Sequence, residues 1–209
     1  MCSFCLEYSF IYVGKREKNQ TITILDKNIT LFRKEIILKK GYVQVYTGNG
    51  KGKTTACLGL VLRAAGAGFK VFIVQFLKQG DYSEIRALEK FKDQVTVEQY
   101  GLGKFVKGNP SDEDLEAGRR GYNRLMDILK KGEHDLVVAE EANVAVTCRL
   151  FSEEELIALV EAKPEHTELV ITGRGAPQSL IERADLVTEM RQIKHYYQNG
   201  VHARIGIEK

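Results

Sequence analysis

The sequence predicts an α/β fold in which a mostly parallel β-sheet carries helices on both faces. From Gly41 onward, strand-like segments alternate with helix-like segments, an order typical of right-handed crossovers between parallel strands. Two predicted strands, 70–76 and 135–139, are almost unbroken apolar runs, which indicates strands that are covered on both faces. A glycine-rich junction between the first strand and the first helix adds a turn suited to phosphate binding.

Capping and glycine signals set the boundaries of the predicted elements. Gly66 and Gly68 supply left-handed positions that end the first helix, and Ser111 with Asp114 gives the long helix an acidic first turn. Ser152 and Glu155 match a capping box. In chain order the sequence predicts strand 42–46, helix 53–66, strand 70–76, helix 83–91, strand 95–100, helix 111–131, strand 135–139, helix 152–162, strand 168–172, helix 177–184 and strand 186–190.

The composition describes an ordinary globular protein. Its 209 residues, 44% hydrophobic and 28% charged, suit one domain with an N-terminal arm. No run of about eighteen apolar residues predicts a membrane span, and the N-terminus lacks the basic start and apolar segment of a secretory signal. Four cysteines are too few and too scattered for a disulfide framework. We therefore expect a cytoplasmic, reduced protein with no membrane partner.

Charge and pattern divide the chain at residue 40. Residues 1–40 form a poorly defined arm in which segments 21–25 and 36–38 could each make a short strand. The arm holds eight Lys or Arg residues against four Asp or Glu residues and so accounts for the net charge of +3. Residues 41–209 form the predicted domain and have no basic excess of the kind that nucleic-acid binding requires. We expect no nucleic-acid partner.

The stretch GNGKGKTT at 48–55 is the predicted phosphate cradle. Its glycines let successive backbone N–H groups point at an anion, and the N-terminus of the next helix adds partial positive charge. Lys53 adds a full charge, and Thr54 offers a hydroxyl to a magnesium ion. The match to G-x-x-x-x-G-K-[ST] is imperfect, because Thr47 occupies the place of the first glycine and Gly48 lies one place later. The alternative is a glycine-rich hairpin with two solvated lysines.

Other polar side chains follow the carboxyl ends of further predicted strands, where ligands bind in parallel sheets. Glu140 and Glu141 end the apolar strand 135–139, and an acidic residue at such a place often serves the magnesium shell of a phosphate-loop protein. A solvated acidic loop start is the alternative. Arg174 lies between two glycines, where it would bind phosphate or substrate carboxamides or simply form a surface turn.

Several blocks of the chain, in order, resemble ATP:corrinoid adenosyltransferases. The blocks are VQVYTGNGKGKTT, LRAAGAG, KVFIVQFLK, DLVVAEEANVA, ELVITGRGAP, LIERADLVTEM and GVHARIGIE, and they cover about Gly41 to Glu208. The resemblance implies a P-loop NTPase-like (RecA-like) fold and transfer of the 5′-deoxyadenosyl group of ATP to a cobalt(I) corrinoid, with triphosphate leaving. The alternatives are a P-loop ATP hydrolase or kinase and a binding regulator without turnover.

The motif and the resemblance together assign roles by position. The residues expected to bind ATP are Gly48, Asn49, Gly50, Lys51, Gly52, Lys53, Thr54, Thr55, Arg63, Glu141 and Arg174. Lys53 and Thr54 would act at the leaving triphosphate, with Thr54 and Glu140 near Mg²⁺, although Glu140 replaces the usual Asp of the family. Phe105 would match an aromatic residue that helps to expel the lower ligand of cobalt. A cobalamin or cobinamide-type corrinoid, a reduced flavoprotein donor and a homodimer are also implied.

Overall fold

Six strands form one sheet in which every neighbouring pair of strands runs parallel. Its spatial order is β3-β2-β4-β5-β1-β6. The strands are β1 (Val43–Thr47), β2 (Val71–Phe76), β3 (Val95–Tyr100), β4 (Leu136–Glu140), β5 (Glu168–Thr172) and β6 (Leu186–Glu189). The predicted parallel α/β sheet is therefore confirmed, and β5 separates β1 from β4, which places these two strands about 10 Å apart.

This computed structural model describes residues 38–104, 106 and 108–208. The predicted arm at 1–40 lies almost entirely outside the described residues, as do the strand expected at 21–25, most of the strand expected at 36–38, and Phe105. The boundary at residue 40 stays a prediction.

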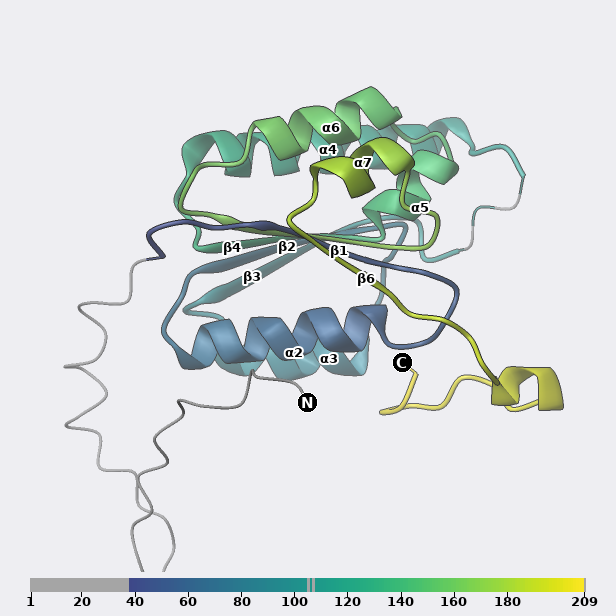
Figure 1. The fold of residues 1–209 in the computed structure, drawn as a ribbon. Helices are drawn as coiled ribbons and strands as arrows, with labels where there is room; N and C mark the ends of the chain where they lie inside the picture. Colours follow the sequence, from purple (N-terminus) through teal and green to yellow (C-terminus); the bar gives the residue numbers. More distant parts are fainter. Residues whose placement is uncertain (1–37, 105, 107, 209) are drawn as a thin grey trace, which may run out of the picture. The chain divides into compact units, whose positions relative to one another are not determined.

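Helices cover both faces of the sheet. Figure 1 shows α2 and α3 on one face and the helices α4 to α7 on the other. The helical elements are α2 (Lys53–Gly66), α3 (Ser83–Leu88), η1 (Glu89–Phe91), α4 (Asp112–Lys131), α5 (Ala142–Thr147), α6 (Glu153–Glu161), α7 (Gln178–Arg183) and η2 (Tyr196–Asn199). No helix among the described residues is long and apolar enough to cross a lipid bilayer.

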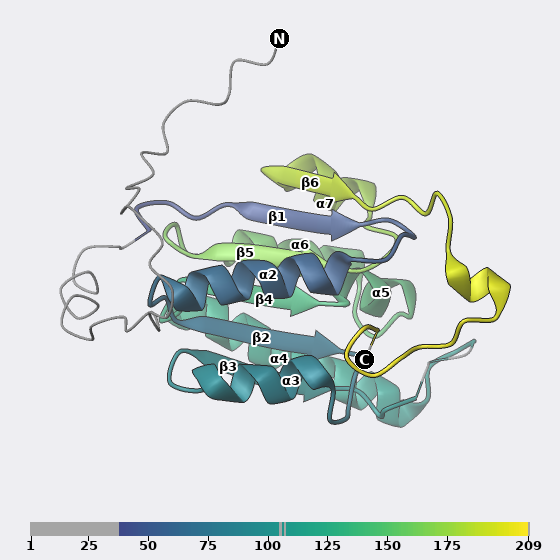
Figure 2. The same cartoon turned by 90° about the horizontal axis from the view of Figure 1, so that it is seen from below.

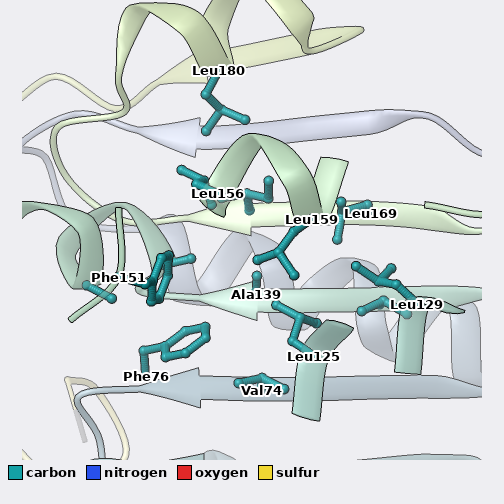
Figure 3. Packing of buried hydrophobic residues seen from close by; sticks show 14 of the residues in the cluster. Val74, Phe76, Leu125, Leu129, Ala139, Phe151, Leu156, Leu159, Leu169 and Leu180 are labelled. Carbon is teal, nitrogen blue, oxygen red and sulfur yellow. The ribbon is translucent and has the colours of Figure 1, made fainter. Parts of the chain in front are cut away.

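The two helical layers give the sheet an apolar core on each side. All residues of β2 and β4 are buried, as their almost unbroken apolar sequences predict. On the face of α4 and α6, Figure 3 shows side chains of both helices packed over those of β2, β4 and β5. Gly121 allows α4 to lie close to the sheet, because a Cβ atom there would be 2.8 Å from Cε1 of Phe76. On the opposite face, Cys57 and Val61 of α2 lie within the second cluster.

Local signals predicted most helix boundaries. Capping boxes at Ser111 and Ser152 begin α4 and α6, and α2 has its predicted bounds. The left-handed position after α2 belongs to Gly68, whose φ is 86°, whereas Gly66 is the last helical residue. The helix expected at 83–91 is divided into α3 and η1. The short elements α5 and η2 are not predicted from the sequence.

Candidate nucleotide-binding site

The glycine-rich loop connects the carboxyl end of β1 to the first turn of α2. Gly48 and Gly52 have φ values of 93° and 121°, a region that side chains disfavour and glycine tolerates. Gly50 donates its N–H to the carbonyl oxygen of Met190 at 2.6 Å. A Cβ atom at Gly50 would lie 2.7 Å from the same oxygen. The chain that leaves β6 therefore supports the loop and requires a glycine against it.

Lys53 opens α2 and turns its ammonium back onto the loop. Its Nζ donates to the carbonyl oxygens of Gly48 at 2.7 Å and Gly50 at 2.8 Å, and the residue is only 8% exposed. Burial lowers the pKa of Lys53, Glu141 acts in the opposite direction, and Arg174 reinforces the lowering. A largely buried ammonium at the first turn of a helix that follows a glycine-rich loop is well suited to a polyphosphate.

Glu140, at the end of β4, is a buried member of a polar network. Its Oε1 accepts from Lys78 Nζ at 2.9 Å, and its Oε2 accepts from Gln75 Nε2. Gln75 Oε1 in turn accepts from Gln99 Nε2 at 3.0 Å. Burial alone would lower the pKa of Lys78, but the Glu140 carboxylate more than offsets this and the pKa is raised. Glu140 is 1% exposed, which excludes a solvated loop start at this residue.

Glu141 adopts an unusual backbone conformation beside this network. Its φ is 59°, which costs about 1 kcal/mol or more for a residue with a side chain. Its N–H donates to Oγ1 of Thr172 at 3.1 Å, which links the end of β4 to the end of β5. Burial raises the pKa of Glu141, against the opposing effects of Lys78 and Lys53. Glu141, with its strained backbone and a carboxylate that feels the charges of Lys78 and Lys53, is a candidate ligand for a cation that accompanies phosphate.

One cavity of about 700 Å³ collects most of the predicted residues. It lies at the edge of the sheet where Figure 2 shows the strands ending. Its lining has five Lys or Arg residues and three Glu residues, a balance that favours an anionic ligand. The predicted residues that line it are Asn49, Gly50, Lys51, Gly52, Lys53, Thr54, Thr55, Glu141 and Arg174.

Other predicted residues lie elsewhere. Gly48 forms the base of the loop behind the lining, Glu140 lies beneath it in the buried network, and Arg63 is exposed in the last turn of α2, outside the lining. Phe105 lies outside the described residues. Lys78 also lines the cavity and was not predicted, although it follows the carboxyl end of the strand 70–76 and the rule that placed Arg174 at this edge would have found it.

A parallel sheet with helices on both faces, a glycine-rich turn after β1 and carboxylates at the end of β4 is consistent with the P-loop NTPase-like class of folds. Within this class, residues 39–208 match the model of the family described as ATP:corrinoid adenosyltransferase BtuR/CobO/CobP. The chain belongs to this family of transferases, and the predicted resemblance is confirmed.

Similar bacterial proteins agree with this membership. The chain is 32% identical over 186 residues to a corrinoid adenosyltransferase of Pseudomonas aeruginosa, covering 88% of this chain and 90% of that protein. It is 35% identical over 172 residues to the corrinoid adenosyltransferase of Escherichia coli K12, covering 81% and 86%. It is also 35% identical over 174 residues to corrinoid adenosyltransferase CobA of Salmonella typhimurium, covering 81% of this chain and 86% of that protein.

Proposed function

We propose that the chain transfers the 5′-deoxyadenosyl group of ATP to the cobalt(I) centre of a corrinoid and releases inorganic triphosphate. The observation that carries the proposal is the convergence of the glycine loop, Lys53, Arg174 and Glu141 on one cavity in a chain of the adenosyltransferase family. The cavity is of the size that binds small-molecule ligands.

The reaction asks little covalent chemistry of the protein. Cobalt(I) of the substrate is itself a nucleophile that attacks the 5′ carbon of ribose, and the carbon–oxygen bond to the triphosphate breaks with its electron pair leaving on oxygen. The protein must align these atoms and stabilise the negative charge that grows on the triphosphate. The presence of Lys53 and of the start of α2 in the cavity lining supports the proposal that they perform the second task.

Mg²⁺ is the proposed cofactor, and the residues present fit it. Thr54 and Glu141 both line the cavity, and hydroxyl and carboxylate oxygens are ligands that Mg²⁺ prefers together with substrate phosphates. When bound, the ion would neutralise part of the triphosphate charge. Glu140, also expected at the metal, accepts a hydrogen bond at each carboxylate oxygen, from Lys78 and from Gln75. We therefore propose that Glu140 supports this region through Lys78 rather than as a ligand.

The finer parts of the proposal depend on the family resemblance. They are a cobalamin or cobinamide-type corrinoid, a reduced flavoprotein that supplies the electron for cobalt(I), a homodimer, a nucleotide contact by Arg63, and a role for Phe105 in removing the lower ligand of cobalt. Removal of an axial ligand changes the reduction potential of a metal centre. Phe105→Ala should therefore slow a reaction that starts from cobalt(II) more than one that starts from chemically prepared cobalt(I).

The test is an anaerobic assay with ATP, Mg²⁺ and chemically reduced cobalamin. Formation of a light-sensitive cobalt–carbon product together with an equal amount of triphosphate would support adenosyl transfer. Accumulation of ADP and phosphate without an organocobalt product would replace the proposal with the hydrolase or kinase alternative.

A further inference from the structure

Lys51, expected beside the phosphates of ATP, donates instead to three oxygens of the C-terminal segment. Its Nζ lies 3.2 Å from Tyr196 Oη, 3.1 Å from the carbonyl oxygen of Ile207 and 3.0 Å from Glu208 Oε1. A lysine ammonium has three N–H donors, so each donor already has an acceptor. Lys51 can donate to a phosphate only if at least one of these bonds is exchanged.

Glu208 is the charged partner of Lys51 and has other donors of its own. Its carboxylate accepts from Arg204 N at 2.9 Å, Nε at 3.2 Å and Nη2 at 3.0 Å, and from the hydroxyl of Tyr196. These donors, Arg204 foremost, hold the pKa of Glu208 well below its usual range, so the carboxylate is ionised at neutral pH. If Lys51 moves away, Arg204 and Tyr196 still satisfy Glu208. The exchange therefore leaves no carboxylate without a partner.

Lys51 is also the attachment point of an exposed segment. Residues 191–208 leave the sheet after β6, turn through η2 and return past the ends of the strands (Figure 2). Among the described residues, the hydrogen bonds that join residues 191–208 to the preceding part of the chain all have Lys51 Nζ as donor. The other hydrogen bonds of the segment are local. Ile193 and Ile205 are 91% and 77% exposed, so little apolar burial adds to this attachment.

We propose that Glu208 is a positioning residue of the nucleotide site, which holds Lys51 against segment 191–208 until the triphosphate of ATP takes its place. The inference rests on the proposed function, because it requires Lys51 to meet a polyphosphate. Exchange of Glu208 for triphosphate frees the segment, whose residues 206–208 form part of the cavity wall. One lysine thereby couples occupation of the loop to release of this part of the cavity wall.

A polyphosphate can displace Glu208 from Lys51 at small energetic cost. The side chain of Lys51 is 38% exposed in its ion pair with Glu208, and a solvent-screened pair of this kind changes a binding constant by at most about fivefold. A triphosphate offers several charged oxygens and also gains Lys53 and the loop N–H groups. We therefore expect Glu208 to weaken triphosphate binding by up to about fivefold without preventing it.

The test uses the full chain with Mg²⁺ and inorganic triphosphate, and combines calorimetric binding with hydrogen exchange of the amides in 196–208. In the wild type, saturating triphosphate should raise exchange in this segment. Glu208→Gln should show high exchange without triphosphate and bind it up to about fivefold more tightly. Lys51→Met should show the same high exchange but bind triphosphate more weakly. The matched control Glu116→Gln, which removes the exposed Arg120–Glu116 pair of α4, should change neither quantity.

The opposite signs of the two binding changes separate this coupling from simple loosening of the segment, which would give both variants the same sign. Triphosphate binding that leaves exchange in 196–208 unchanged or lowers it would overturn the inference and leave the proposed function intact, as would a Glu208→Gln variant that binds triphosphate no more tightly than the wild type. A wild-type chain that binds neither triphosphate nor ATP would overturn both.

Discussion

Replacing Lys53 with methionine tests the assignment of the triphosphate site. The change keeps an unbranched side chain in the first turn of α2 and removes the ammonium that now donates to Gly48 and Gly50 at 2.7 and 2.8 Å. Because Lys53 is 8% exposed, water and salt screen its charge only weakly. One charge-assisted hydrogen bond to the leaving triphosphate contributes about 1.5–3 kcal/mol, so kcat/KM should fall roughly 10- to 100-fold.

The fold should tolerate this substitution. Burial disfavours the charged form of Lys53, and this cost offsets the two hydrogen bonds that the methionine variant loses. We expect the free energy of unfolding in urea to change by no more than about 1 kcal/mol. A loss of several kcal/mol would show that the ammonium is mainly a structural group of the loop.

The assay is the anaerobic formation of the photolabile product from ATP and chemically reduced cobalamin, with triphosphate affinity measured separately by calorimetry. Lys130→Met, at an exposed position in the last turn of α4, is the matched control and should behave as the wild type. If Lys53→Met retains full turnover and binds triphosphate as tightly as the control, the placement of the triphosphate at this loop is wrong.

Three further predictions concern the surroundings of Lys53. Glu140→Gln should lower the free energy of unfolding in urea by roughly 3 kcal/mol, because it leaves the largely buried Lys78 without its carboxylate partner. Glu141→Gln should leave this stability almost unchanged and raise the Mg²⁺ concentration needed for half-maximal activity. Equal effects of the two substitutions would contradict the roles proposed for these residues. Gly50→Ala should abolish triphosphate binding, since its Cβ would lie 2.7 Å from Met190 O, and a variant with normal affinity would show that the loop can shift. Triphosphate affinity should fall as pH rises through a value below the ordinary lysine pKa of 10.5, because burial lowers the pKa of Lys53 and only its protonated form binds the anion; a profile that is flat up to pH 10.5 would disagree.

Much of the fold could be predicted because its signals are local. The buried strands at 70–76 and 135–139 are almost unbroken apolar runs, and the capping boxes at Ser111 and Ser152 each join residues only three positions apart at the start of a helix. The edge of the sheet that carries the site follows from parallel connections alone. These features do not depend on which distant side chains meet.

The parts that could not be predicted depend on distant contacts. The hydrogen bond to Glu140 comes from Lys78, which follows the neighbouring strand β2 and is distant in sequence, and a role of Glu140 at a metal stays a prediction. The hydrogen bond from Lys51 to Glu208 likewise joins residues far apart in the chain, and phosphate binding by Lys51 stays a prediction. The short helix α5 follows Glu141, whose φ is positive, and a glutamate in that conformation gives no sequence signal.

The sheet order also determines when the glycine-rich loop at 48–52 can form during synthesis. β1 is one of the first elements to be made, yet its neighbours in the sheet are β5 and β6, which come last. Chains grow from the N-terminus, and pairings of such high sequence separation form slowly because the intervening loop must first be closed. The loop at 48–52 also donates a hydrogen bond, from the N–H of Gly50, to the carbonyl oxygen of Met190, just after β6. A nascent chain shorter than this should therefore have no ordered triphosphate site, and retention on immobilised ATP would report that the whole sheet has folded.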